Sequence, residues 1–125
     1  NYVRNIISLD ANTLLTATED GAYLFDIRAR RWLAVPDLQG INLFSLGWEP
    51  ARRRVWLGTY LHGVLGFDLP ANPYDVARWT RVQQVLNGFT VLHLYDDPVR
   101  RLLWLSTDRG LAALNRRVGT NPTIR

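Results

Sequence analysis

The sequence predicts an all-β fold, a segment of a β-propeller with about three four-stranded blades. The main observation is an internal repeat in which an apolar segment ends in a threonine and a short turn leads to a glycine. The threonines are Thr18, Thr59 and Thr107, and they recur at intervals of about 40 to 50 residues, the period of propeller blades. In addition, no window of the chain shows the sustained apolar stripe of a helix.

Each repeat predicts four short strands in chain order. The first is an apolar run (residues 6–9, 43–46 and 91–94), followed in the second and third repeats by a proline turn. The second ends at the repeated threonine, and the glycine after it permits a tight turn because glycine adopts left-handed conformations without steric cost. The third runs to an Asp or Asn, and the fourth carries a tryptophan. The nearly continuous apolar strands indicate sheets buried on both faces between blades.

The tryptophans are predicted to pack between the blades, because they recur at strand positions. Trp56 and Trp104 share a position in the second strand, and Trp32 and Trp79 share one in the fourth. Trp48 has no aromatic equivalent in the first repeat, and it fits either a surface platform or a simple turn.

The repeats place blade 1 at about residues 3–36, blade 2 at about 41–83 and blade 3 at about 89–125. The fourth strand of blade 3 is unclear, because residues 116–125 contain no tryptophan. Closed propellers typically have about 4 to 8 blades, and unpartnered terminal blades would expose apolar sheet. We therefore expect a segment of a longer protein, with a small domain that closes by self-association as the alternative.

Two segments resemble the two-component regulator propeller repeat, whose signature is apolar-Trp-apolar-Gly-Thr, a short turn, Gly-Leu and an aromatic-Asp ending. They are residues 55–59 with Gly63, and residues 103–111. The likeness extends over almost all of the chain as roughly three repeats. It departs from the signature at Leu15 in place of the Trp, at Val64 after the glycine, and at Asn115 in place of the Asp.

The resemblance implies a ligand-sensing region in the extracytoplasmic part of a bacterial two-component signalling protein, often one that recognises oligosaccharides. A membrane span and a histidine kinase would then lie elsewhere in the parent chain, and binding would shift a dimeric assembly between signalling states. The implied partners are a small extracellular ligand such as an oligosaccharide, the remaining blades of the parent chain, and a second copy in a homodimer. The implied location is periplasmic or extracellular, with no direct membrane contact by this segment.

Composition is consistent with a secreted or periplasmic globular segment, since 47% of the residues are hydrophobic and 21% are charged. The absence of cysteine excludes disulfides and thiolate chemistry. All 15 basic side chains are arginines, and the net charge is +4. Because the repeat disperses most of them among turns, we expect solvated turn arginines and no nucleic-acid partner. A weaker interpretation is an anionic ligand such as an acidic oligosaccharide, which guanidinium groups would bind.

The sequence does not predict catalysis in this segment. His62 and His93 are the only histidines, and neither has a carboxylate or a second histidine at metal-ligand spacing, so we expect no metal and no cofactor. His93 lies in an apolar strand, which favours a buried structural role. Asp26 and Asp68 hold equivalent repeat positions, which indicates a turn role and not acid–base chemistry.

Loops at one rim of the predicted propeller form the candidate ligand site. The loops that join second to third strands converge there with those that join successive blades, and such loops carry recognition because the sheets hold them in place. The candidates provide an aromatic face, an imidazole, a cation and two amides, and they are Tyr60, His62, Arg109, Gln39 and Asn87. This mixture suits a polyhydroxylated or acidic sugar, whereas ordinary polar loop residues are the alternative at each position.

Two other functions stay open at this point. The first is a propeller scaffold for protein or glycan interaction in an envelope or secretion complex. The second is part of a polysaccharide-active propeller enzyme whose catalytic residues lie outside these 125 residues.

Overall fold

The computed structural model describes residues 2–115 and 123–124, which form twelve strands and two short 3-10 helices. The first sheet contains β1 (Val3–Asp10), β2 (Thr13–Thr18), β3 (Gly21–Asp26) and β4 (Arg31–Ala34). The second contains β5 (Leu43–Glu49), β6 (Arg54–Thr59), β7 (Val64–Asp68) and β8 (Thr80–Val85). The third contains β9 (Val91–Asp97), β10 (Leu102–Thr107), β11 (Gly110–Asn115) and β12 (Thr123–Ile124). The 3-10 helices are η1 (Pro36–Leu38) before β5 and η2 (Val76–Arg78) before β8.

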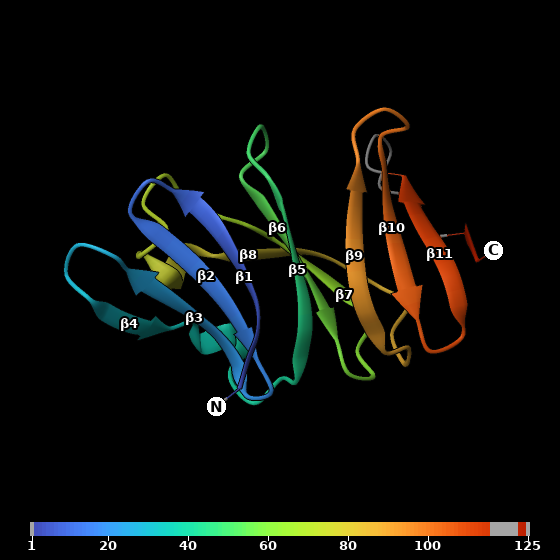
Figure 1. Cartoon of the computed structure of the whole chain (residues 1–125), viewed down its shortest axis with the longest axis horizontal. Helices are drawn as coiled ribbons and strands as arrows, with labels where there is room; N and C mark the ends of the chain where they lie inside the picture. The colour runs from blue at the N-terminus through green and yellow to red at the C-terminus, as the bar shows by residue number, and fades with distance from the viewer. Residues whose placement is uncertain (1, 116–122, 125) are drawn as a thin grey trace.

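Each sheet is an antiparallel meander, in which strands that follow one another in the chain are neighbours. The three sheets stand side by side, with β5 next to β1 on one side and next to β9 on the other (Figure 1). The predicted all-β fold of four-stranded sheets is confirmed. The strand β12 pairs with β11 through Ala112 and Ala113, whereas residues 116–122 and 125 of the predicted third blade lie outside the described residues.

The repeated threonine holds the turn between the second and third strands of every sheet. Its hydroxyl donates to the carbonyl oxygen of the repeated glycine, at 2.8 Å from Thr18, 2.8 Å from Thr59 and 2.7 Å from Thr107. The same hydroxyl accepts a backbone N–H from within the turn, that of Asp20, His62 or Arg109. The repeat that is visible in the sequence is therefore a turn held by a side chain.

A buried carboxylate holds the turn between the first and second strands of the second sheet. Glu49, at the end of β5, accepts hydrogen bonds from Trp56 Nε1 at 3.2 Å and from Arg52 Nε at 2.7 Å. Because a buried carboxylate is costly without partners, the indole N–H and the guanidinium together stabilise it.

The third sheet repeats this arrangement with an aspartate. Asp97, at the end of β9, accepts from Trp104 Nε1 at 3.0 Å and from a guanidinium nitrogen of Arg100 at 2.9 Å. The acid, the arginine three positions later and the tryptophan seven positions later have the same spacing in both sheets.

These contacts extend the expectation of solvated turn arginines, because some of the arginines also form ion pairs. Arg52 and Arg100 each form an ion pair with a buried carboxylate. Arg54 lies in β6, not in a turn, and pairs with Asp68 at 2.6 Å; this hydrogen-bonded ion pair raises the pKa of Arg54. Arg52 and Arg100 keep 40% and 67% of their side chains exposed, so they are solvated as expected and also neutralise buried carboxylates. The expectation was wrong for Arg54, whose side chain is largely buried beside the partly exposed Asp68.

Asp97 gives the chain a stability that depends on acid pH. The hydrogen bond from Trp104, followed by the backbone N–H of Arg100, lowers the pKa of Asp97 from 3.8 to about 2. The unfolded chain therefore binds a proton at Asp97 at a higher pH than the folded chain does. The stabilisation is complete above about pH 4 and is lost as the pH falls through about 2.

We expect an Asp97→Asn variant to lose less stability than the wild type when the pH falls from 4 to 2. Urea unfolding at several pH values measures this, with a substitution of the exposed Asp37 on η1, Asp37→Asn, as the control. Glu19 and Asp26 retain part of the dependence, because hydrogen bonds from backbone N–H groups lower their pKa values too. Identical pH profiles for Asp97→Asn and the wild type would contradict the assignment.

The core consists of two apolar layers, one on each face of the second sheet. Between the first and second sheets, Leu15 and Leu24 belong to the same buried cluster as Leu57 and Phe67. Between the second and third sheets, the buried cluster contains Trp56, Val64, Val85, Val91, Leu103, Leu105, Ala112 and Leu114. Each fully buried leucine contributes about 1.5–3 kcal/mol to the free energy of folding. The prediction of a sheet buried on both faces is confirmed for the second sheet.

The outer faces of the first and third sheets are exposed in this chain. Trp56 and Trp79 are buried as predicted, but Trp32 is 57% exposed and Trp104 is half-buried. Trp32 lies across from Phe25 on β3, with ring centroids 4.7 Å apart, on the face that points away from the second sheet. The prediction that Trp32 packs between blades was wrong for this chain, because no described residue covers that face.

Candidate functional site

The turn at residues 60–63 and the loop at residues 86–90, both of the second sheet, are held together by backbone hydrogen bonds. The N–H of Gly88 donates to the carbonyl of Leu61, and the N–H of Gly63 donates to that of Phe89, both at 2.9 Å. The N–H of Leu61 also donates to Thr90 Oγ1 at 3.1 Å. These bonds fix two neighbouring loops that sequence analysis places at the same rim.

Left-handed backbone occurs in both loops at residues other than glycine. Leu61 has φ 64° and Leu86 has φ 56°. Leucine rarely adopts this region, and strained backbone of this kind persists only where the surroundings enforce it, often at binding sites. The strained backbone is a second feature that favours a binding role for this rim.

Neighbouring blades extend the rim on both sides. Towards the third sheet, Asp108 N–H donates to the carbonyl of Thr90, and Thr90 N–H donates to Asp108 Oδ1, both at 3.0 Å. The guanidinium of Arg109 lies 4.3 Å from the ring centroid of Phe89. Towards the first sheet, Tyr60 N–H donates to the carbonyl of Asn42 at 2.8 Å. The rim therefore joins the loops of the second sheet to the β10–β11 turn of the third sheet and to the connection that leads from the first sheet into β5.

A pocket of about 310 Å³ opens at this rim, and we call it the rim pocket. Two apolar side chains, Ile41 and buried Leu65, line it together with exposed polar groups. The polar lining residues are His62, Arg81, Gln84 and Asn87. The size is at the lower end of small-ligand sites, which suits one small polar unit with an apolar face.

Hydrogen bonds order part of the polar lining of the rim pocket. Gln84 Nε2 donates to the carbonyl of His62 at 3.1 Å and to Asn87 Oδ1 at 3.3 Å. Gln84 thus connects strand β8 to both loops. No carboxylate lines the pocket among the described residues, so the lining carries the positive charge of Arg81.

The structure brings together some of the sequence-predicted site residues and separates others. His62 and Asn87 line the rim pocket. Arg109 adjoins it, because its guanidinium donates to the carbonyl of Gly88 at 3.4 Å. Tyr60 belongs to the same turn as His62 and is 49% exposed, but it is not among the residues that line the pocket. Gln39 is not among the lining residues; it lies after η1, against the β2–β3 turn that contains Gly21, at the first sheet's part of the rim.

Sequence analysis missed Arg81, Gln84 and Ile41. Arg81 and Gln84 lie in β8, and a register shift between Gly66 and Phe67 in the β7–β8 pairing decides which β8 side chains share a face. That shift leaves no clear signal in the sequence. Ile41 follows η1, in the connection between the first two sheets.

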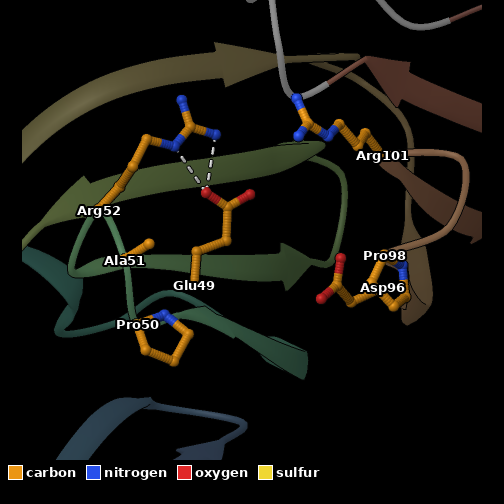
Figure 2. A pocket seen from close by; sticks show the side chains of 7 residues that line it. All are labelled: Glu49, Pro50, Ala51, Arg52, Asp96, Pro98 and Arg101. Carbon is orange, nitrogen blue, oxygen red and sulfur yellow. Dashed lines mark hydrogen bonds and ion pairs between the residues drawn. The ribbon is translucent and has the colours of Figure 1, made fainter.

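A larger pocket of about 640 Å³ lies between the turn that follows β5 and the turn that follows β9. Figure 2 shows the Glu49–Arg52 ion pair on one side of it, with Asp96, Pro98 and Arg101 on the other. Its charged groups are of both signs, and Glu49 and Arg52 already serve the turn described above. The lining of this pocket therefore does not indicate whether a ligand would be an anion or a cation.

The position of His93 differs from the buried role that the sequence predicted. It lies in β9 and is exposed, on the outer face of the third sheet, so the expected buried role was wrong. Among the described residues, no group of three or more His, Asp or Glu side chains is arranged to hold a metal ion. None of the helices in the described part of the chain is long and apolar enough to cross a membrane.

Comparison of the whole fold with solved structures identifies the architecture. The extracellular domain of a protein described as a hybrid two-component system from B. thetaiotaomicron superposes with a TM-score of 0.73 and 19% identity. The β-propeller domain of Cps50 (Swd1) from Myceliophteria thermophila gives 0.72 and 13%, covering 98% of this chain and 44% of that domain's chain. The fold is that of a β-propeller segment. An ancestral GH74 enzyme is similar as well, with a TM-score of 0.72 and 13% identity.

The propeller segment spans only part of these structures. The match to the two-component protein includes 99% of this chain but only 16% of that protein's chain. The match to the GH74 enzyme includes 100% of this chain but only 18% of the enzyme's chain. No protein-family model matches the sequence. No curated protein matches it either. At these identities the likeness establishes the propeller fold alone.

Proposed function

We propose that this chain is a ligand-binding segment from the extracytoplasmic sensor region of a bacterial two-component signalling protein, and that the rim pocket binds one unit of an oligosaccharide. The observation that carries the proposal is the rim pocket itself. It combines an imidazole, two amides and a guanidinium with apolar Ile41 and Leu65. Sugars present hydroxyl groups at their edges and C–H groups on their faces, and such a lining complements both.

The hydrogen bonds that hold the loops around the rim pocket favour ligand binding. Hydrogen bonds between the turn 60–63 and the loop 86–90 hold the loops before any ligand arrives. A preorganised site loses less entropy when it binds, which raises affinity. The fold likeness to an extracellular domain of a two-component protein agrees with a sensor located outside the cytoplasm.

Hydrolysis is a weaker candidate at this pocket, although one similar structure is a GH74 enzyme. Glycoside hydrolysis generally needs a pair of carboxyl groups flanking the bond. The rim pocket is lined by no Asp or Glu among the described residues. We therefore propose recognition of the sugar without its cleavage, and signalling through the rest of the parent protein.

Calorimetric titration of the chain with a panel of neutral and acidic oligosaccharides tests this proposal. We expect at least one to bind, and His62→Ala and Asn87→Ala each to weaken that binding about tenfold or more, the loss of one or two hydrogen bonds. His93→Ala is the matched control, because it removes an exposed histidine on the outer face of the third sheet. The absence of binding to every sugar, or equal weakening by His93→Ala, would overturn the proposal.

A further inference from the structure

We propose that the rim pocket selects an acidic sugar and that Arg81 binds its carboxylate; this inference rests on the proposed function. The first observation concerns charge. The guanidinium of Arg81 is the one formal charge among the residues that line the rim pocket within the described chain. A neutral ligand would leave that charge without a counterpart.

Arg81 differs from the arginines that serve the fold. Arg52, Arg54 and Arg100 each form an ion pair with a carboxylate. Arg53 donates to the backbone carbonyl of Pro70. By contrast, Arg81 forms no ion pair and no hydrogen bond with another described residue, and its guanidinium lies over the ring of Phe67. Its guanidinium is thus available to a ligand without breaking an internal contact.

The sheet holds Arg81 in place for this role. Arg81 lies opposite Phe67 in the β7–β8 pairing, and its guanidinium carbon is 5.6 Å from the ring centroid of Phe67. Phe67 is fully buried, so the ring offers the guanidinium a rigid face to stack on. Stacking restrains the long side chain while leaving the N–H groups at its edge free to donate.

The other polar groups of the pocket add donors. Asn87 Oδ1 already accepts from Gln84, which leaves the Asn87 Nδ2 group as a donor for a ligand. Guanidinium binds planar carboxylates through two parallel hydrogen bonds, a stronger and more directional contact than one to a hydroxyl. A uronic acid unit supplies such a carboxylate, together with hydroxyl groups for the amides and a C–H face for Ile41 and Leu65.

The test compares each acidic sugar with its neutral form. Trisaccharides that contain glucuronic, galacturonic or mannuronic acid are titrated into the chain, and so are their methyl esters. We expect at least one acid to bind tenfold or more tightly than its ester. Arg81→Gln should reduce this preference to about twofold or less. Arg81→Lys should retain an intermediate preference, because lysine keeps the positive charge but cannot form the two parallel hydrogen bonds of a guanidinium.

Arg78→Gln is the matched control, since Arg78 lies three positions away at the end of η2, with an exposed side chain paired to Asp75. It should leave the preference unchanged, and thermal unfolding of each variant checks that the fold is retained. Equal affinity for acid and ester in the wild type, or an unchanged preference in Arg81→Gln, would overturn this inference while the proposed function stands. Failure of neutral and acidic sugars alike would overturn both.

Discussion

Gly63→Ala is expected to lower the free energy of unfolding by about 3 kcal/mol or more, the upper part of the range for single substitutions. Gly63 has φ 68°, a left-handed conformation that alanine adopts at a cost of about 1–2 kcal/mol. A Cβ atom there would also lie 2.0 Å from the carbonyl oxygen of Val85 and 2.5 Å from that of Leu86. Both neighbours are backbone atoms, so the clash can be relieved only by moving the chain.

Gly88→Ala separates the steric effect from the conformational one. Gly88 also has a positive φ, 95°, but nothing lies within 4 Å of the position that its Cβ would occupy. We expect it to cost only about 1–2 kcal/mol. Urea unfolding of both variants measures the difference, and similar losses would contradict the packing of turn 60–63 against residues 85 and 86. Under the proposed function, Gly63→Ala should also weaken sugar binding, because it displaces the loops that form the rim pocket.

Trp56→Ala is expected to destabilise the chain by about 3–5 kcal/mol, the usual cost of removing a large buried aromatic side chain. Trp56 is 1% exposed and belongs to the apolar cluster between the second and third sheets. Its ring lies over Gly66, where an added Cβ would be only 2.8 Å from the ring. The substitution would leave a cavity on that face, and it would also remove the indole N–H that donates to buried Glu49.

Trp32→Ala is the control for residue type. Trp32 is exposed on the outer face of the first sheet, where Phe25 is its aromatic neighbour. We expect a loss of about 1 kcal/mol, the size of one aromatic pair contact. Denaturant unfolding of both variants gives the comparison, and a cost for Trp56→Ala no larger than that for Trp32→Ala would show that the sheets do not pack as described.

The candidate site was predictable only in part. His62 was predicted from its place in a rim loop, and the structure places it with Asn87 because both belong to loops of one sheet joined by hydrogen bonds. Gln39 was grouped with them because of its loop position, but it lies beside Gly21 at the first sheet and does not line the pocket. Arg81 was not predicted, because a strand arginine reaches the pocket only through a register shift that the sequence does not reveal.

The strands, the turns and their repetition follow from local sequence patterns, since they depend on contacts between residues a few positions apart. The threonine hydroxyl bonds of Thr18, Thr59 and Thr107 each extend over only three or four residues. The tertiary structure alone decided which face of each sheet is covered, so that Trp56 is buried and Trp32 is not. It also decided that Glu49 and Asp97 are buried and paired with arginines whose side chains stay exposed, and that Arg81 lines a pocket with His62. Burial depends on the neighbouring sheet and on strand register, and these follow from non-local packing that local sequence patterns do not encode.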